Sequence, residues 1–171
     1  VHQLEVGNMQ NFTYILEDEE TNEAIVIDPS WDLQNVLQII ERNNLKIKYI
    51  VNTHYHFDHT IGNEAISKAT GAKIIQHKDS TLKHDVTVSN GDKIKFGNSE
   101  LTVFHTPGHS KDSICLVGNG KIFSGDTLFV GNCGRVDLLG GSARELYHSL
   151  FDVISKMDDT LELYGGHNYG Q

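Results

Sequence analysis

Short apolar runs alternate with polar turns over most of the chain, which is typical of strands mixed with short helices. Two such runs, 12–16 and 24–27, flank an acidic turn and predict a β-hairpin, which Asp28 and Pro29 end. Further strands are predicted at 49–51, 73–76, 101–104, 114–117, 121–123 and 161–164. The expected fold class is a layered α/β fold, because strands and helices of this kind bury their apolar faces against one another.

Three segments carry apolar residues at helical spacing. The first runs from residue 33 to the polar stretch 42–44, with Asp32 as its expected N-cap. The second covers 63–70 and is closed by a glycine, which readily takes the left-handed conformation of a helix end. The third is expected over 142–156, with Ser142 as its cap. Its apolar face is formed by Leu146, Leu150, Val153, Ile154 and Met157.

Composition narrows the classes of partner. The 171 residues include 23 acidic and 14 basic side chains, for a formal net charge of −9. An acidic surface repels phosphate backbones and anionic headgroups, so we expect neither a nucleic-acid partner nor a membrane partner. No repeat or linker interrupts the pattern, which predicts one domain over 1–171, truncated at both ends. The two cysteines and the lack of a signal-like start indicate a cytoplasmic protein.

Residues 52–60, NTHYHFDHT, concentrate histidine and aspartate more than any other segment. On an extended segment His54, His56 and Asp58 point the same way, and His59 follows as the chain turns. Four ligands from one loop cannot surround an ion without gaps, so distant residues must complete the site. The candidates stand at predicted strand ends, each next to a glycine that lets the backbone approach closely: His109, Asp126 and His167.

This set of side chains predicts a centre for two metal ions. A lone buried histidine is usually a hydrogen-bonded core residue, but HxHxDH spacing with three further candidates is hard to explain that way. Nitrogen and carboxylate ligands without thiolate suit zinc, iron or manganese. Two ions about 3.5–4 Å apart can hold a hydroxide and stabilise a developing oxyanion. One ion would take His54, His56 and His109, the other Asp58, His59 and His167, with Asp126 as the bridge.

Four segments resemble the metallo-β-lactamase superfamily in order and spacing. They are THYHFDH (53–59), HTPGHS (105–110), SGDTLF (124–129) and GGHNYG (165–170). The resemblance covers nearly the whole chain and agrees with the ligand assignment position by position. It implies an αββα sandwich, in which helices flank two mixed sheets and the metal ions lie at one edge between them. The expected cofactors are two divalent ions, zinc foremost, with a single iron(II) or a zinc and iron pair as alternatives.

Residues 131–150, GNCGRVDLLGGSARELYHSL, resemble the branch that contains glyoxalase II and the persulfide dioxygenases. Similarity to glyoxalase II implies hydrolysis of a hydroxyacyl thioester, a small substrate derived from a thiol. It assigns substrate binding to Arg135 and Tyr169, and Asp58 would act as both ligand and proton acceptor. The segment after Arg135 is closer to the dioxygenases, and the helical region that completes the glutathione site lies outside these residues. The thiol carrier therefore stays open.

The dioxygenase branch is the alternative. It resembles mono-iron enzymes that use the equivalents of His54, His109 and Asp126, a facial triad with open positions for oxygen and a sulfur substrate. The seven ligand positions are compatible with both activities. We lead with the hydrolase because it uses the complete set most simply. A β-lactamase or a phosphodiesterase is also compatible with the superfamily, whereas a purely structural module would not need an open two-ion site. His105 is expected to pack beside the site without binding metal.

Overall fold

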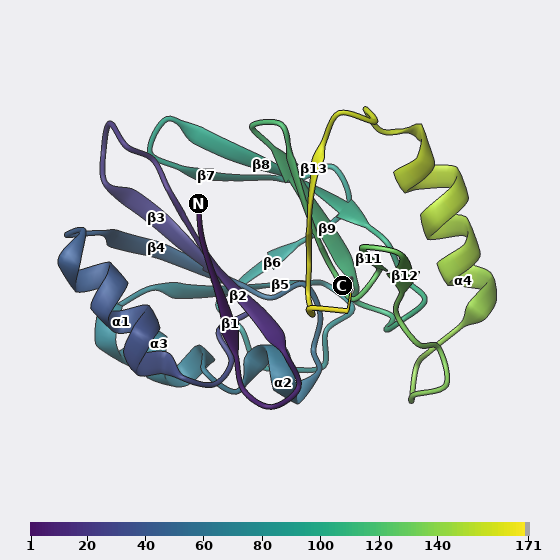
Figure 1. Cartoon of the computed structure of the whole chain (residues 1–171), viewed down its shortest axis with the longest axis horizontal. Coiled ribbons are helices and arrows are strands. Elements are labelled where there is room, and N and C mark those ends of the chain that lie inside the picture. The colour runs from purple at the N-terminus through teal and green to yellow at the C-terminus, as the bar shows by residue number, and fades with distance from the viewer. Residues whose placement is uncertain (170–171) are drawn as a thin grey trace.

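Two β-sheets form the centre of the molecule (Figure 1). The computed structural model describes residues 1–169. The first sheet has six strands in the order β1-β2-β3-β4-β5-β6. Their bounds are β1 His2–Val6, β2 Asn11–Glu17, β3 Glu23–Ile27, β4 Lys46–Val51, β5 Lys73–His77 and β6 Val86–Val88. The second has five, in the order β13-β10-β9-β8-β7. They are β7 Lys93–Phe96, β8 Ser99–His105, β9 Ile114–Gly118, β10 Lys121–Gly125 and β13 Glu162–Gly165.

Both sheets are mixed, as expected. In the first sheet β1, β2 and β3 are antiparallel neighbours, whereas β3, β4, β5 and β6 run parallel. In the second sheet β10 and β13 are parallel and the other pairs antiparallel. The predicted hairpin is confirmed, with Tyr14 of β2 opposite Ile27 of β3. β1, which was not predicted, adds an edge strand to this hairpin. A short ribbon of β11 (Leu128–Phe129) and β12 (Asn132–Cys133) follows β10.

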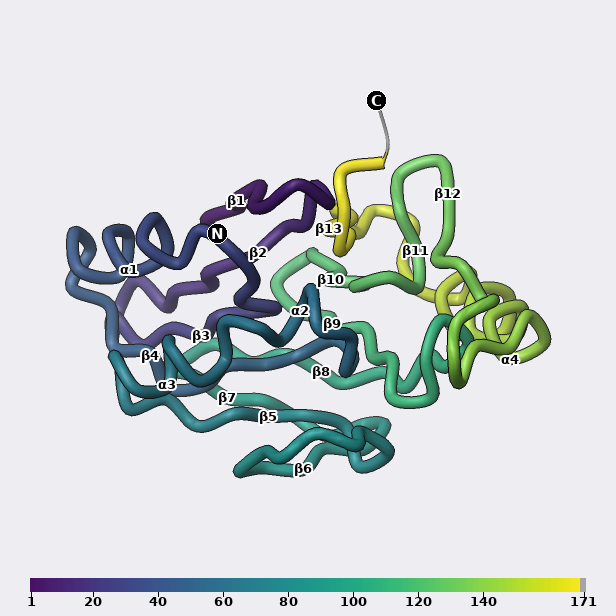
Figure 2. The backbone as a smooth tube through the Cα atoms, turned by 90° about the horizontal axis from the view of Figure 1, so that it is seen from below, coloured from purple at the N-terminus to yellow at the C-terminus, as the bar shows by residue number. Residues whose placement is uncertain are grey.

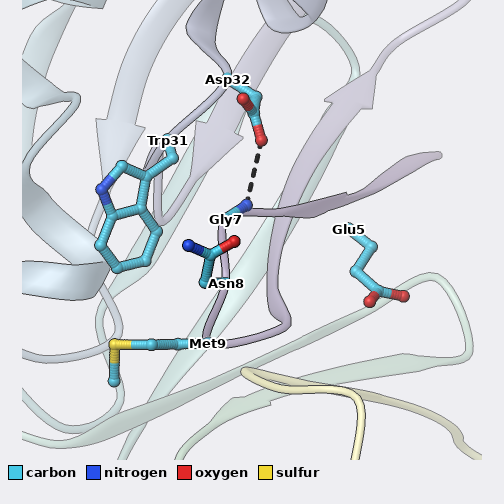
Figure 3. A pocket seen from close by; sticks show the side chains of 6 residues that line it. All are labelled: Glu5, Gly7, Asn8, Met9, Trp31 and Asp32. Atoms are coloured by element: carbon cyan, nitrogen blue, oxygen red, sulfur yellow. Dashed lines mark hydrogen bonds between the residues drawn. The ribbon is translucent and has the colours of Figure 1, made fainter.

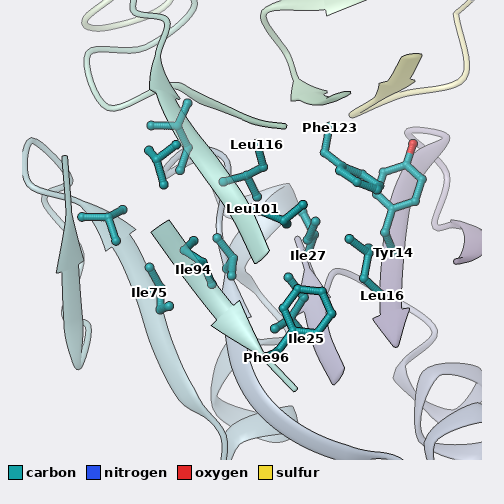
Figure 4. Close-up of a cluster of buried hydrophobic side chains, with 14 residues drawn as sticks. Tyr14, Leu16, Ile25, Ile27, Ile75, Ile94, Phe96, Leu101, Leu116 and Phe123 are labelled. Carbon is teal, nitrogen blue, oxygen red and sulfur yellow. The ribbon is translucent and has the colours of Figure 1, made fainter. Parts of the chain in front are cut away.

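Apolar side chains from both sheets fill the space between them (Figure 4). Ile25 and Ile27 come from the first sheet, and Phe96 and Leu116 from the second, and all four are almost completely buried. Burying one such side chain contributes roughly 1.5–3 kcal/mol. This core holds the two sheets in one relative position and therefore also holds the loops at their edge.

Helices cover the outside of the sandwich. α1 (Leu33–Arg42) and α3 (Asn63–Thr70) pack on the outer face of the first sheet, where Val36 and Ile66 join its second apolar cluster. α3 has the predicted bounds and ends at Gly71 with φ 77°. α4 (Ala143–His148) lies at the opposite side of the molecule (Figure 1). The predicted αββα sandwich is thereby confirmed. Within residues 1–169, no helix has the length and apolar character needed to cross a bilayer.

Two details of the helix predictions need refinement. Asp32 is the N-cap residue of α1, as predicted, but it has the left-handed conformation and its side chain makes no capping hydrogen bond. Its carboxylate instead accepts a hydrogen bond of 3.0 Å from the backbone N–H of Gly7, in the loop after β1 (Figure 3). Ser142 caps α4 as predicted, accepting from the N–H of Glu145. However, the α-helix ends at His148, and the chain continues as a wider turn, Ser149–Val153, and a 3₁₀ turn, Ile154–Lys156.

Candidate metal centre

Loops at one edge of the sandwich bring all seven predicted ligands together. β4 leads directly into the 52–60 loop, and β10 ends at Gly125, just before Asp126. β13 runs parallel to β10, so its end at Gly165 places His167 at the same edge. The loop between β1 and β2 also reaches this point, beside the end of β13 (Figure 2). There Asn11, the first residue of β2, forms an isolated bridge with His167. Residues far apart in sequence therefore surround one volume.

His54, His56 and His109 form the first triad. Nδ1 of His56 lies 3.1 Å from Nε2 of His54 and 2.9 Å from Nε2 of His109. Nitrogen atoms ~2.0–2.1 Å from a tetrahedral zinc ion are about 3.3 Å from each other. The three nitrogens are therefore spaced as the ligands of one ion are.

Asp58, His59 and His167 form the second triad. Nε2 of His59 lies 3.2 Å from Nε2 of His167. Oδ2 of Asp58 lies 3.3 Å from the same atom of His59 and 3.5 Å from Nε2 of His167. These distances again match the separations between ligands of a single ion. The two triads are among the side-chain groups close enough to share an ion, and a further possible group joins Asp28 to His54 and His59.

Asp126 lies between the two triads. Its Oδ2 is 3.4 Å from Nε2 of His109 and 3.2 Å from Nε2 of His167, and its Oδ1 is 3.4 Å from Nε2 of His59. The carboxylate is buried, and within residues 1–169 no hydrogen-bond donor reaches Oδ1. A buried, unpaired carboxylate oxygen is costly unless a cation satisfies it. Its position and its unpaired oxygen both fit a carboxylate that bridges two ions.

Hydrogen bonds on the outer side orient the histidine rings. Nδ1 of His59 donates to Oδ2 of Asp28 at 3.0 Å, Nδ1 of His109 to the carbonyl of Arg135 at 2.8 Å, and Nδ1 of His167 to the carbonyl of Met9 at 2.9 Å. Because carbonyl and carboxylate oxygens only accept, each Nδ1 carries a proton, and in the neutral ring each Nε2 presents a lone pair to the cluster. Lone pairs that face carboxylate oxygens at this range repel, so this donor set fits a cation.

Two residues of this outer layer were missed. Asp28 also accepts from the N–H and hydroxyl of Thr53, at 2.7 and 2.6 Å, and so ties the start of the 52–60 loop to β3. A signal existed, because Asp28 directly follows a predicted strand, as Asp126 does. Asn11 is buried, and its Nδ2 donates to Oδ2 of Asp58 at 2.9 Å and to the backbone carbonyl of Asp58 at 3.0 Å. No local pattern singles out Asn11.

The electrostatics of the cluster favour cations. Burial and the neighbouring imidazoles lower the pKa of His54 and bring that of His56 to about 4. Burial also opposes a charge on His59, but the surrounding carboxylates, Asp126 foremost, outweigh it and raise the pKa of His59 well above its usual value. Burial would raise the pKa of Asp58, but the hydrogen bond and charge of His59 lower it. Protons and metal ions compete for the same imidazole nitrogens and carboxylate oxygens, so metal binding should release protons.

Glycines keep the centre compact. Gly166 faces the cluster, and a Cβ atom there would overlap Oδ1 of Asp126. Gly134 is similarly close, since a Cβ would overlap the backbone carbonyl of Asp126. Gly125 has φ 51°, a conformation that costs glycine little. The expectation that glycine allows close backbone approach at these strand ends is met.

A cavity of about 470 Å³ opens above the centre. Arg135 and Tyr169, the predicted substrate-binding residues, both line it, together with ligand side chains and the apolar Met9, Phe57 and Leu138. The Tyr169 ring stacks on His167, with ring centroids 5.0 Å apart and planes 1° from parallel. Five of the seven proposed ligands, all except His54 and His59, therefore line a pocket large enough for a small organic molecule.

Two local expectations need correction or refinement. The extended segment expected through Asp58 ends at His56, because residues Phe57–Thr60 form the short helix α2. Asp58 still faces the centre, from a helical turn and not from strand alternation. His105 lies outside the cluster, as expected. It stacks on the buried His77, with ring centroids 4.0 Å apart, and its Nε2 donates to the carbonyl of Lys111.

Comparisons with known proteins agree with this geometry. Hydroxyacylglutathione hydrolase of Pelagibacter ubique (strain HTCC1062) is 35% identical over 93% of this chain and 67% of its own length. Mitochondrial persulfide dioxygenase ETHE1 of Mus musculus is also 35% identical, over 92% of this chain and 64% of its own length. The chain thus spans about two thirds of the length of these relatives. The crystal structure of ETHE1 from Myxococcus xanthus is 32% identical and superposes with a TM-score of 0.94, covering 98% of this chain and 75% of that one.

The sequence profile of the Metallo-beta-lactamase superfamily matches residues 6–84 and 76–167, which together include every proposed ligand. The relatives divide at the same identity between a hydrolase and a dioxygenase, so they support an enzyme of this superfamily without selecting one reaction. On its fold, its profile match and its relatives, the chain belongs to the metallo-beta-lactamase superfamily.

Proposed function

We propose that this protein hydrolyses a thioester derived from a small thiol, using two divalent metal ions, zinc foremost. The observation that carries this proposal is the position of Asp126, whose two oxygens reach both triads within 3.4 Å. A centre for one ion would leave several of the seven side chains without a role as ligands. All seven predicted ligands have a place in the two-ion arrangement.

Two ions bound there would supply hydroxide at neutral pH and stabilise the negative charge that develops on the acyl oxygen. The chain's own contribution is to hold the ligand side chains in position through the hydrogen bonds on their outer side. Asp58 lines the cavity, and its lowered pKa keeps it ionised at neutral pH, so it can accept a proton from the attacking water. In the net reaction a water oxygen bonds to the acyl carbon, the C–S bond breaks, and the thiol leaves with a proton.

Arg135 and Tyr169 are proposed to contact the substrate, because both line the cavity beside the ligands. Tyr169 presents a half-exposed ring, and Arg135 lies on the segment after β12. Both cysteines, Cys115 and Cys133, are free thiols, which supports the proposed cytoplasmic location. The proposed partner is therefore a small thiol-derived molecule.

The test combines metal content with turnover. Protein stripped of metal is loaded with zinc, with iron(II) or with both, and bound metal is counted while thiol release from a lactoyl thioester is followed. We expect two ions per chain and turnover that chelation abolishes and zinc restores. His54→Ala and Asp126→Ala should both be inactive. Turnover by the chelated protein, or by either variant, would contradict the proposal.

A persulfide dioxygenase is the second candidate. It is favoured by the close superposition on the ETHE1 crystal structure and by the 35% identity to the mouse dioxygenase. Here one iron(II) would be held by His54, His109 and Asp126, two imidazoles and a carboxylate that leave positions open. One iron per chain, with oxygen uptake driven by a persulfide, would decide for this activity. Two zinc ions per chain without oxygen uptake would decide against it.

A further inference from the structure

Asn52 directly follows β4 and begins the loop that carries four of the proposed ligands. Its side chain is buried, and its amide makes four hydrogen bonds, which uses its full capacity. Nδ2 donates to the backbone carbonyl of His59 at 3.1 Å and to Oδ1 of Asn63 at 3.0 Å. Oδ1 accepts from Nδ2 of Asn63 at 2.7 Å and from Nε2 of Gln76 at 2.8 Å. One buried amide therefore ties the start of the loop to its end, to α3 and to β5.

The orientation of this amide is determined by its neighbours. The carbonyl oxygen of His59 can only accept, so the atom of Asn52 that faces it must be the donor Nδ2. Oδ1 then needs donors, which Asn63 and Gln76 supply. Gln76 is itself buried in β5, and its Oε1 accepts from the hydroxyl of Ser80 at 2.6 Å, which leaves Nε2 for Asn52. Turning the Asn52 amide over would place Oδ1 against the His59 carbonyl and leave buried polar groups unpaired, so one orientation is strongly preferred.

The two ends of this loop are held by different side chains. At the start, the backbone N–H and the hydroxyl of Thr53 donate to the carboxylate of Asp28, at 2.7 and 2.6 Å. These bonds do not involve the Asn52 side chain, so they hold the start of the segment that supplies the first triad without it. At the other end, the amide of Asn52 holds the backbone of His59, one residue after Asp58. Loss of the amide should therefore loosen the second triad more than the first.

Building on the proposed two-ion centre, we propose that Asn52, oriented by Gln76, is a positioning residue for the second metal ion. Neither residue belongs to the described lining of the cavity above the centre, so both act through the backbone of His59. Their role is to keep Asp58 and His59 at the spacing that the second triad requires, 3.3 Å between Oδ2 and Nε2. A chain of hydrogen bonds thus runs from Ser80 through two buried amides to the turn that carries two ligands.

Metal affinities measure this role without turnover. Metal-free protein is titrated with zinc in competition with a chelator of known affinity, and the two binding steps are resolved for each variant. His167→Ala, which lacks a ligand of the second triad, identifies the step that belongs to that triad. We expect Asn52→Ala to lower the affinity for the second ion about 10-fold or more and that for the first ion less than about three-fold. Gln76→Met, which keeps the length of the side chain without its amide, should lower the second affinity by a smaller factor.

The double variant shows whether Gln76 acts through Asn52. If it does, adding Gln76→Met to Asn52→Ala should cause no further loss of affinity at the second triad, whereas independent effects would add. Ile66→Val is the control for general destabilisation, because Ile66 is buried in α3 within the apolar cluster on the outer face of the first sheet. It removes a methyl group but no hydrogen bond, and it should leave both affinities unchanged.

An unchanged second affinity in Asn52→Ala, or an equal loss at both triads, overturns the inference. A further loss in the double variant, as large as that of Gln76→Met alone, overturns the part played by Gln76. If Asn52→Ala does not fold, Gln76→Met decides, and an unchanged second affinity in it overturns the inference. A wild-type chain that binds only one ion contradicts the two-ion proposal and this inference with it. Two ions in the wild type with unchanged affinities in the variants contradict this inference alone.

Discussion

Nδ2 of Asn11 donates a hydrogen bond of 2.9 Å to Oδ2 of Asp58, and both side chains are buried. The two residues are 47 positions apart, at the start of β2 and in α2. The same Nδ2 reaches the backbone carbonyl of Asp58 at 3.0 Å, so one amide group holds this residue at two points. Asn11 therefore orients a carboxylate that is both a proposed ligand and the proposed proton acceptor.

Replacing Asn11 should weaken the second metal position. Asn11→Ala leaves Oδ2 of Asp58 without its donor, and loss of such an outer contact typically lowers metal affinity 10–100-fold, about the range we expect here. Competition with a chelator of known affinity measures the effect for each ion. Asn8→Ala, at an exposed position in the loop after β1, is the control. Equal affinities in Asn11→Ala and the wild type would show that the contact is not needed for metal binding.

His167→Ala should separate the two candidate activities. It removes one ligand of the second triad and leaves His54, His109 and Asp126 in place. For the hydrolase we expect one ion per chain and thioester turnover reduced at least about 100-fold. For the dioxygenase, oxygen uptake should largely survive. Metal counts and both assays on this variant, beside His54→Ala, check the prediction. A His167→Ala protein with full thioester turnover would remove the case for two ions.

Gly166→Ala should disturb the bridge, because the new Cβ atom would overlap Oδ1 of Asp126. The carboxylate must rotate or the backbone must move, so we expect loss of one bound ion and a fall in turnover of about 10-fold or more. The neighbouring Gly165→Ala is the control, since its nearest atom would be a ring carbon of Phe129 at 3.2 Å. If both variants bind two ions equally, the lack of a side chain at residue 166 is not what keeps Asp126 in position.

His77 should make the folded protein sensitive to mild acid. Burial and the stacked His105 lower the pKa of His77 to about 4, whereas an unfolded histidine has a pKa of about 6.5. Between these values the unfolded chain binds more protons, so the free energy of unfolding rises with pH and is lost as pH falls. At pH 5 this linkage amounts to about 2 kcal/mol.

The measurement is denaturant unfolding at pH 5 and pH 7, in a chelator so that metal loss does not contribute. His77→Gln should reduce the difference between the two pH values by about that amount, whatever its effect on stability at pH 7. His148→Gln, which removes a histidine whose pair with Asp152 is open to solvent, should change the difference by much less. An unchanged difference in His77→Gln would mean that the pKa of His77 is the same in the folded and unfolded states.

Local patterns were enough to predict several elements and to single out the candidate ligands that the fold brings together. The bounds of α3 follow from its apolar spacing and from Gly71, and the β2–β3 hairpin follows from two apolar runs around a polar turn. The proposed ligands could be recognised because three histidines and an aspartate crowd into positions 54–59 and the others follow strand ends. Such signals depend only on residues that are close in sequence. Residue propensities and the periodicity of apolar positions describe these local relationships.

Contacts between distant segments could not be predicted in this way. Asp28 and His59 are 31 positions apart, and they meet because β3 and β4 pair in parallel. Asp32 stands at the N-cap of α1, as local grounds predict, but its carboxylate accepts from the loop after β1 and not from the helix. Even the ion pair between Arg135 and Asp137 depends on side-chain conformations that spacing does not specify. Periodicity records which face of an element is buried, whereas the order and packing of the strands decide which polar groups meet there.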